Sequence, residues 1–194
     1  MQDDPVRPPP VLASIWADTE AAGFSFPSDY KLGGLLRVLA ASKPGGNLLE
    51  VGTGTGLATA WLLDGMDASA HLTSIEANGK WAAIAAKHLR TDPRLKLLDA
   101  DAFSWFGGQA DASFDFVFAD AMPGKFDGFD ALWRLLKPGG IYVIDDLMPQ
   151  PNWPEGQQER VDIVLKDLDE RPDARVARLS WATDIVIAVK SLPA

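Results

Sequence analysis

From Gly46 onward, short apolar runs alternate with amphipathic stretches along the chain. Such runs are typical of strands, and apolar residues three to four positions apart indicate helices. Strands are expected at residues 47–51, 71–76, 95–98, 114–120 and 140–145. Helices are expected between them at residues 55–66, 79–90, 102–106 and 129–137. Strict alternation of the two predicts an α/β protein with a parallel, doubly wound sheet covered by helices on both faces.

The two ends of the chain have different patterns. Helices are expected at residues 11–22 and 28–41, with Ser28 or Asp29 available to cap the second one. After a helix at residues 154–170, two strands at residues 174–181 and 184–190 follow with only a short link, so we expect them to pair antiparallel. Residues 1–10 are polar and proline-rich and predict a flexible tail. The remainder predicts one domain over residues 11–194, with N-terminal helices at 11–44 and a ligand-binding sheet at 45–194.

Acidic residues recur where the predicted strands end. They are Glu50, Glu76, Asp99, Asp101, Asp120, Asp145 and Asp146. In an open parallel sheet, ligands bind outside the carboxyl ends of the strands, so these acids are expected at one edge. Carboxylates gathered there repel one another and raise one another's pKa unless something compensates. The pattern favours a cationic ligand, a hydroxyl-rich ligand or a metal ion. The alternative is that each acid caps the helix that follows it.

A glycine-rich turn follows the first predicted strand, with the pattern E-x-G-x-G-x-G over residues 50–56. Glycine lets the backbone approach a ligand closely, and the next helix points its N-terminal amides at the site. The turn has neither the G-x-G-x-x-G spacing of dinucleotide sites nor the phosphate loop that ends in G-K-[ST]. Glu76 lies about 20 residues beyond Gly56, where an acid ending the second strand can accept both ribose hydroxyl protons.

Composition narrows the function classes further. The chain has 18 Lys and Arg against 27 Asp and Glu, a formal net charge of −9. This charge argues against nucleic acid or an anionic membrane as the main partner. The 194 residues include no cysteine, which excludes cysteine-ligated metals, disulfides and thiol nucleophiles. No apolar run approaches the ~20 residues of a membrane span, and the first residues lack the order of a signal peptide. A cytoplasmic protein is therefore expected.

The motifs, in this order, resemble those of class I S-adenosylmethionine-dependent methyltransferases. They are residues 49–56 (L-E-V-G-T-G-T-G), 74–76 (S-I-E), 101–102 (D-A), 114–120 (F-D-F-V-F-A-D) and 136–140 (L-K-P-G-G). The resemblance implies a Rossmann-like seven-stranded sheet in the order 3-2-1-4-5-7-6, mostly parallel with an antiparallel C-terminal hairpin. It also implies that S-adenosylmethionine is the cofactor, whose cationic end suits an acidic edge.

The resemblance further implies roles for individual residues. Glu50 and the glycine turn lie near the methionine part, and Glu76, with Ala77 beside it, holds the ribose. Asp101 and Ala102 face the adenine amino group. The full set implied for cofactor binding is Glu50, Gly52, Thr53, Gly54, Gly56, Glu76, Ala77, Asp101, Ala102 and Asp120.

Within that superfamily, the chain is most similar to the catechol- and caffeoyl-coenzyme-A-type O-methyltransferases. In that group, an Asp after strand four and an Asp-Asn pair after strand five hold a divalent cation; the matching residues here are Asp120, Asp145 and Asp146. Three carboxylates suit Mg²⁺ or Ca²⁺. The second position of the pair departs from the group's Asn, and the alternative is that Asp145 and Asp146 bind backbone amides or cap the loop.

The group's catalytic lysine lies three residues past the strand-four Asp, where this chain has Pro123; the nearest lysine is Lys125. Asp120 and Lys125 are the expected catalytic residues, because either side chain can accept a proton from an acceptor hydroxyl. Trp153 lies in a proline-rich loop beyond the fifth strand and is the expected wall of the acceptor pocket; the alternative is that it only packs against the protein.

The predicted activity is methyl transfer from S-adenosylmethionine to a small-molecule acceptor, at a hydroxyl oxygen. Two alternatives stay open: an NAD(P)-dependent Rossmann oxidoreductase, and a catalytically silent protein that binds S-adenosylmethionine. Dimers are common in the group that the chain resembles, so a homodimer is one expectation.

Overall fold

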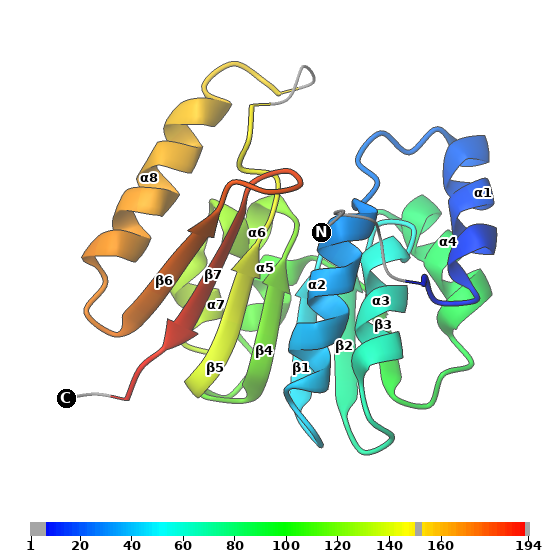
Figure 1. The fold of residues 1–194 in the computed structure, drawn as a ribbon, viewed down its shortest axis with the longest axis horizontal. Coiled ribbons are helices and arrows are strands. Elements are labelled where there is room, and N and C mark those ends of the chain that lie inside the picture. The colour runs from blue at the N-terminus through cyan, green and yellow to red at the C-terminus, as the bar shows by residue number, and fades with distance from the viewer. Residues whose placement is uncertain (1–6, 150–152, 193–194) are drawn as a thin grey trace. The chain divides into compact units, whose positions relative to one another are not determined.

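The computed structural model describes residues 7–149 and 153–192. Its helices are α1 (Leu12–Ala22), α2 (Tyr30–Ala41), α3 (Leu57–Gly65), α4 (Gly79–Leu89), α5 (Ala102–Phe106), α6 (Met122–Lys125), α7 (Phe129–Trp133) and α8 (Gln157–Glu170). Its strands are β1 (Asn47–Val51), β2 (His71–Glu76), β3 (Leu95–Asp99), β4 (Phe114–Ala119), β5 (Leu136–Ile144), β6 (Ala174–Leu179) and β7 (Ile185–Lys190). Figure 1 shows these elements on the ribbon.

The strands form a seven-stranded sheet in the order β3-β2-β1-β4-β5-β7-β6. β1 pairs parallel with β2, β2 with β3, and β4 with β5. β7 pairs antiparallel with both β5 and β6. The predicted α/β class, strand order and antiparallel C-terminal hairpin are confirmed. The chain divides into two compact units, Met1–Ala102 and Phe103–Ala194, each described by itself below.

In the first unit, α2 packs closely against α3. Asp29 caps α2 by accepting hydrogen bonds from the amides of Lys31 and Leu32. A Cβ atom at Gly33 would lie only 2.2 Å from Nε1 of Trp61, so the absence of a side chain at Gly33 lets the buried indole of α3 reach α2.

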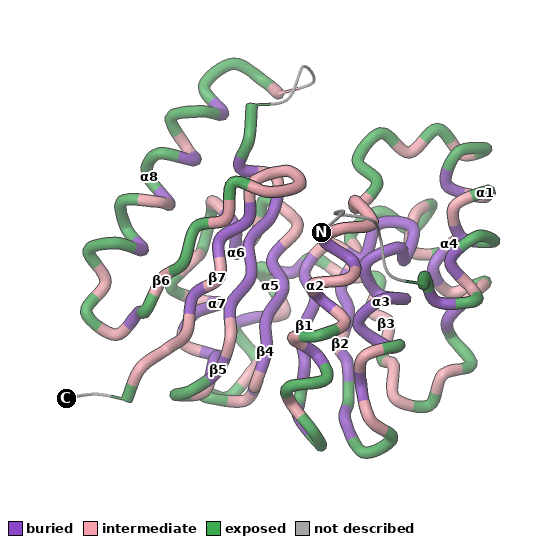
Figure 2. The backbone as a smooth tube through the Cα atoms, in the orientation of Figure 1, coloured by how far each residue is buried: buried purple, intermediate pink, exposed green. Residues whose placement is uncertain are grey.

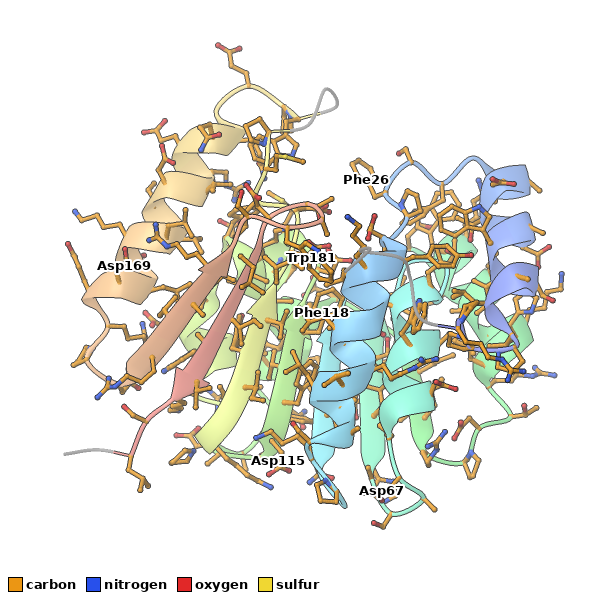
Figure 3. The ribbon with its side chains drawn as sticks, in the orientation of Figure 1. Phe26, Asp67, Asp115, Phe118, Asp169 and Trp181 are labelled. Carbon is orange, nitrogen blue, oxygen red and sulfur yellow. The ribbon has the colours of Figure 1, made fainter. Side chains whose placement is uncertain are left out.

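The second unit has a core of large aromatic and aliphatic side chains. Phe116 and Phe118 of β4 and Tyr142 of β5 are completely buried, and Trp133 of α7 lies 5.7 Å from the ring of Tyr142. Figure 2 shows the buried stretches of β4, β5 and β7, and Figure 3 labels Phe118 on its strand. Strands that are buried on both faces read as almost continuous apolar runs, which explains the sequence of β4.

The helix predicted at residues 129–137 is too long. α7 ends at Trp133, and Leu136 already pairs with Phe114 as the first residue of β5. The register between β4 and β5 then shifts before Phe116 pairs with Ile141, which accommodates the turn-forming residues 137–140 within the strand. Residues with turn propensity had indicated a later strand start. The short α6 was not predicted.

Two further expectations concern the chain's ends and its hydropathy. Residues 1–6 of the predicted tail lie outside the described residues; of the rest, Arg7 accepts a hydrogen bond from Arg37 at its carbonyl oxygen. Among the described residues, none of the helices is sufficiently long and apolar to span a bilayer.

Candidate active site

The glycine turn of the first unit lies between β1 and α3. The amides of Gly52 and Thr53 donate to the carbonyl oxygen of Ile75 on β2, which holds the start of the turn against the sheet. Gly52, Gly54 and Gly56 have φ values of 97°, 53° and 95°, a left-handed region that other residues rarely occupy. A Cβ atom at Gly56 would also lie 2.9 Å from Leu89 of α4. The sequence therefore needs glycine here for both conformation and packing.

Glu50 lies beneath this turn as a wholly buried carboxylate. Its Oε2 atom accepts hydrogen bonds from the hydroxyls of Ser74 on β2 and Thr59 on α3. Because the Ser74 hydroxyl donates to Glu50, the Thr53 hydroxyl donates to Ser74 in turn, which connects the turn to the buried acid. Oε1 of Glu50 is buried and has no hydrogen-bond partner among the described residues.

Burial raises the pKa of Glu50 to about 7. Removal from water disfavours the charged carboxylate, and the negative charge of Glu76 adds to the effect. The hydrogen bonds from Ser74 and Thr59 oppose the shift. A positive charge brought near Oε1 would stabilise the ionised carboxylate.

Glu76 ends β2 and reaches back to the glycine turn. Its Oε2 accepts from the amide of Gly54 at 2.8 Å, and its Oε1 accepts from the amide of Asn78 at 2.9 Å. Each carboxylate oxygen retains lone-pair capacity for a further donor. The strand register sets Glu76 beside Asp99, the last residue of β3.

The remaining cofactor candidates of this unit lie near the same strand ends. Ala77 and Asp101 are exposed, whereas Ala102 is buried at the start of α5. The amide of Ala100 donates to the carbonyl oxygen of Glu76, so the segment after β3 is tied to the end of β2. Not every predicted acid faces solvent: Glu50 is enclosed by protein, while Asp99 and Asp101 are exposed.

In the second unit, the structure brings three predicted metal ligands together. One carboxylate oxygen each from Asp120, Asp145 and Asp146 lie within 4.8 Å of one another. Asp120 directly follows β4, and the other two directly follow β5. The parallel pairing of β4 and β5, with Ala119 opposite Ile144, explains why the three acids meet.

Asp145 is only 2% exposed, and its pKa is raised to about 6. Burial is the main cause, and the charge of Asp146 adds to it. Thr183 donates a hydrogen bond to Oδ1 of Asp145, and the ammonium of Lys125 attracts the carboxylate; both lower the pKa. The three acids thus form a crowded, negative cluster.

Lys125 is buried, with 5% of its surface exposed, although it lies in a short turn. The hydroxyl of Tyr142 donates to the carbonyl oxygen of Gly124, the residue before it, at 2.6 Å. Gly124 has a φ of 83°, and a Cβ atom there would lie 2.2 Å from Leu132. The turn is therefore fixed from both sides, and it holds Lys125 close enough to attract Asp145.

Comparison with known proteins places this geometry in a family. A family profile described as a methyltransferase domain matches residues 49–147, just over half of the chain. The chain belongs to the methyltransferase domain family. The matched segment begins just before Glu50 of the glycine turn and ends just after the three clustered acids.

Relatives agree with this family membership, and solved structures share the fold. A candidate O-methyltransferase of Mycobacterium avium is 34% identical over 120 residues, which are 58% of this chain and 53% of that protein. The chain thus matches about half the length of such relatives. The O-methyltransferase TomG of Streptomyces achromogenes, solved with SAM, shares 22% identity over 96% of this chain and 92% of its own, with a TM-score of 0.82. An O-methyltransferase of Bacillus cereus, solved with SAH, shares 20% over 93% and 90%, with a TM-score of 0.81. These structures establish the methyltransferase fold.

Some residues of this methyltransferase domain were missed by the sequence analysis. Ser74 stands opposite Glu50 in the β1–β2 register, so strand pairing could have indicated it. The contacts of Thr59 and Thr183 with the buried acids could not be predicted, because threonine is common on helices and in links. The ring of Phe24 would touch a Cβ atom at Gly54 at 3.0 Å, so an aromatic side chain from the link between α1 and α2 lies on the glycine turn.

The predicted acceptor wall is only partly described. Residues 150–152 of its loop lie outside the described residues, and Trp153 is half-buried. A role for Trp153 in the acceptor pocket stays a prediction.

Proposed function

We propose that this chain is an S-adenosylmethionine-dependent methyltransferase that methylates a hydroxyl oxygen of a small-molecule acceptor. The observation that carries the proposal is the buried Oε1 atom of Glu50, which lacks a partner among the described residues beneath the glycine turn. A buried acceptor without a donor costs free energy unless a ligand or water satisfies it. The sulfonium and ammonium groups of S-adenosylmethionine provide the positive charge that such a site favours.

The donor would be held by the first unit. The glycine turn offers backbone amides and a close approach, and Glu76 accepts hydrogen bonds from the ribose hydroxyls through its remaining lone pairs. Asp101 and Ala102 would contact the adenine. Glu50 would supply negative charge near the methionine part of the donor. The absence of a lysine or arginine in residues 50–57 makes the turn a poorer site for a pyrophosphate.

Methyl transfer from a sulfonium is an in-line displacement. The S–CH₃ bond breaks as the O–CH₃ bond forms, the sulfonium becomes a neutral thioether, and the acceptor hydroxyl loses its proton. We assign that proton to Asp120 or to Lys125, since either side chain can act as a general base. The protein's remaining tasks are to orient the acceptor oxygen about 3 Å from the methyl carbon and to exclude water.

The donor set of Asp120, Asp145 and Asp146 fits a divalent cation. It consists of carboxylate oxygens within 4.8 Å of one another, which are ligands that Mg²⁺ and Ca²⁺ prefer. Burial is the main cause of the raised pKa of Asp145, and the like charge of Asp146 adds to it; a cation would relieve that repulsion. When bound, such a cation lowers the pKa of a coordinated hydroxyl. Its binding is part of this proposal.

The experiment is a methyl-transfer assay on the whole chain. Purified protein would be incubated with methyl-labelled S-adenosylmethionine and a panel of catechols, phenols, amines and carboxylic acids, with Mg²⁺, with Ca²⁺ and with chelator. Labelled product from a hydroxyl-bearing acceptor supports the proposal. Cofactor binding without transfer to any acceptor would favour a silent binding protein, and binding of NADH instead would favour an oxidoreductase. A small-molecule acceptor, a homodimer and a cytoplasmic location stay predictions.

A further inference from the structure

The link between β6 and β7 reaches the acidic cluster of the second unit. Trp181, labelled in Figure 3, lies in this link, two residues before Thr183. The Thr183 hydroxyl donates to Oδ1 of Asp145, the most buried of the three clustered acids. A hydrogen bond to one carboxylate oxygen restrains rotation of the whole group, as partners of metal-bound carboxylates commonly do.

Thr183 also holds the backbone that follows β5. Its carbonyl oxygen accepts from the amides of Leu147 and Met148, both at 3.0 Å. The residue therefore contacts the segment after β5 through its side chain and its main chain together. β5 and β7 are paired up to Ile144 and Val186, so the link emerges directly beside the acids.

The backbone is strained on both sides of this contact. Asp146, Ala182 and Asp184 have φ values of 55°, 57° and 63°. In the described parts of the chain, only one other non-glycine residue, Ala112, has a positive φ. This conformation is unfavourable for residues that carry a Cβ atom, and it persists only where surrounding contacts hold it. Thr183 lies between Ala182 and Asp184, and its contacts join their segment to the one that follows Asp146.

A separate feature of the acidic cluster is the positively charged side chain of Lys125 near it. The Lys125 side chain is nine-tenths buried, and its charge acts on Asp145. Within residues 7–149 and 153–192, no hydrogen bond or ion pair within 4.0 Å is formed by its ammonium. The single positive charge of Lys125 does not neutralise the negative charge of three carboxylates.

We propose that Thr183 is a positioning residue, which fixes the Asp145 carboxylate so that the acidic cluster binds a divalent cation. The inference rests on the proposed function, in which that cation serves the acceptor hydroxyl. Without the Thr183 hydroxyl, the Asp145 carboxylate would lose its side-chain hydrogen bond at Oδ1 and would be less restrained, while the main-chain contacts of residue 183 would remain. Loss of such a partner typically weakens metal affinity by about 10- to 100-fold.

The test compares variants by their affinity for Mn²⁺, measured from the loss of the free-ion electron paramagnetic resonance signal. Thr183→Val is expected to weaken Mn²⁺ binding by about 10-fold or more, and Thr183→Ser to restore most of it. Ser180→Ala is the matched control, because the Ser180 hydroxyl donates to Asp184 in the same link. All variants should bind S-adenosylhomocysteine like the wild type. Should Thr183→Val fail to fold, Thr183→Ala carries the same comparison.

The possible outcomes separate this inference from the proposed function. Mn²⁺ affinity that is unchanged in Thr183→Val overturns the positioning role. So does a wild-type protein that transfers methyl groups yet binds no Mn²⁺ at millimolar concentration; that result leaves the proposed function intact. A Thr183-dependent Mn²⁺ site in a protein that binds no S-adenosylhomocysteine supports the positioning role and contradicts methyl transfer.

Discussion

Glu50 and Ser74 face each other across the β1–β2 pair, and the serine hydroxyl donates its hydrogen to the buried carboxylate. This contact connects the glycine turn to the sheet, because Thr53 donates to the same serine. The acid is therefore an internal group whose charge acts on the turn from below.

The buried Glu50 predicts an unusual dependence of stability on pH. Its pKa is about 7 in the folded protein against an ordinary value of 4.5, so the folded state binds more protons than the unfolded state between these values. The free energy of unfolding should then fall as the pH rises from about 4.5 to about 7 and level off above it, by an amount on the order of 3 kcal/mol. Urea unfolding at several pH values checks this.

The matched variant is Glu50→Gln, which cannot ionise. Asp145 also has a raised pKa, so the contribution of Glu50 is the difference between wild type and variant at each pH. The difference in unfolding free energy should move in favour of the variant as the pH rises. A constant difference from pH 5 to pH 8 would contradict the buried, ionisable assignment.

Asp120→Ala should abolish methyl transfer while most of the cofactor binding persists. Removing one of three clustered carboxylates eliminates a proton acceptor and a cation ligand, whereas the glycine turn and Glu76 are untouched. Turnover should fall by about 10²-fold or more, as expected for loss of a general base. Single-turnover assays and calorimetry with S-adenosylhomocysteine measure the two effects separately. Full activity would exclude Asp120 from catalysis.

Lys125→Met should lower kcat by about 10²-fold with little change in affinity for S-adenosylhomocysteine. The variant retains most of the length of the buried side chain but removes the charge that acts on Asp145. Lys166→Met is the control, because Lys166 lies on the exposed face of α8 in an i,i+4 pair. Equal kcat values for the two variants would show that Lys125 has only a structural role.

Gly33→Ala should destabilise the protein by about 1–3 kcal/mol, because the added Cβ atom would overlap the indole of Trp61. Gly107→Ala is the control, since a Cβ atom there lies 3.8 Å from its nearest neighbour, Ser104. Thermal unfolding of both variants gives the comparison. An equal melting temperature for Gly33→Ala and wild type would contradict the close packing of α2 on α3.

Much of the fold could be predicted because its signals are local. Periodic apolar residues and glycine punctuation located all seven strands, and the missing helix between the last two predicted their antiparallel pairing. β5 was placed too late because Leu136 joins the sheet before a turn, and only pairing with Phe114 reveals this. Turn-forming residues such as 137–140 look the same in the sequence whether they lie within a strand or just before it.

The candidate site was predictable in its acids and unpredictable in their surroundings. Acids at strand ends follow from topology, so Asp120, Asp145 and Asp146 were expected to meet. The hydroxyl of Thr59 binds Glu50, and the hydroxyl of Tyr142 binds Gly124, the residue before Lys125, and both contacts depend on how separate elements pack. No pattern in the sequence encodes those contacts.

The central claim is that the glycine turn with its two acids binds S-adenosylmethionine. The most direct measurement is titration calorimetry of the folded chain with S-adenosylhomocysteine, with NADH as the comparison and Glu76→Ala as the variant. We expect saturable binding of S-adenosylhomocysteine, at least about 10-fold weaker binding in Glu76→Ala because its hydrogen bonds to the ligand are lost, and no binding of NADH. A folded protein that binds neither S-adenosylhomocysteine nor S-adenosylmethionine at millimolar concentration would contradict the account.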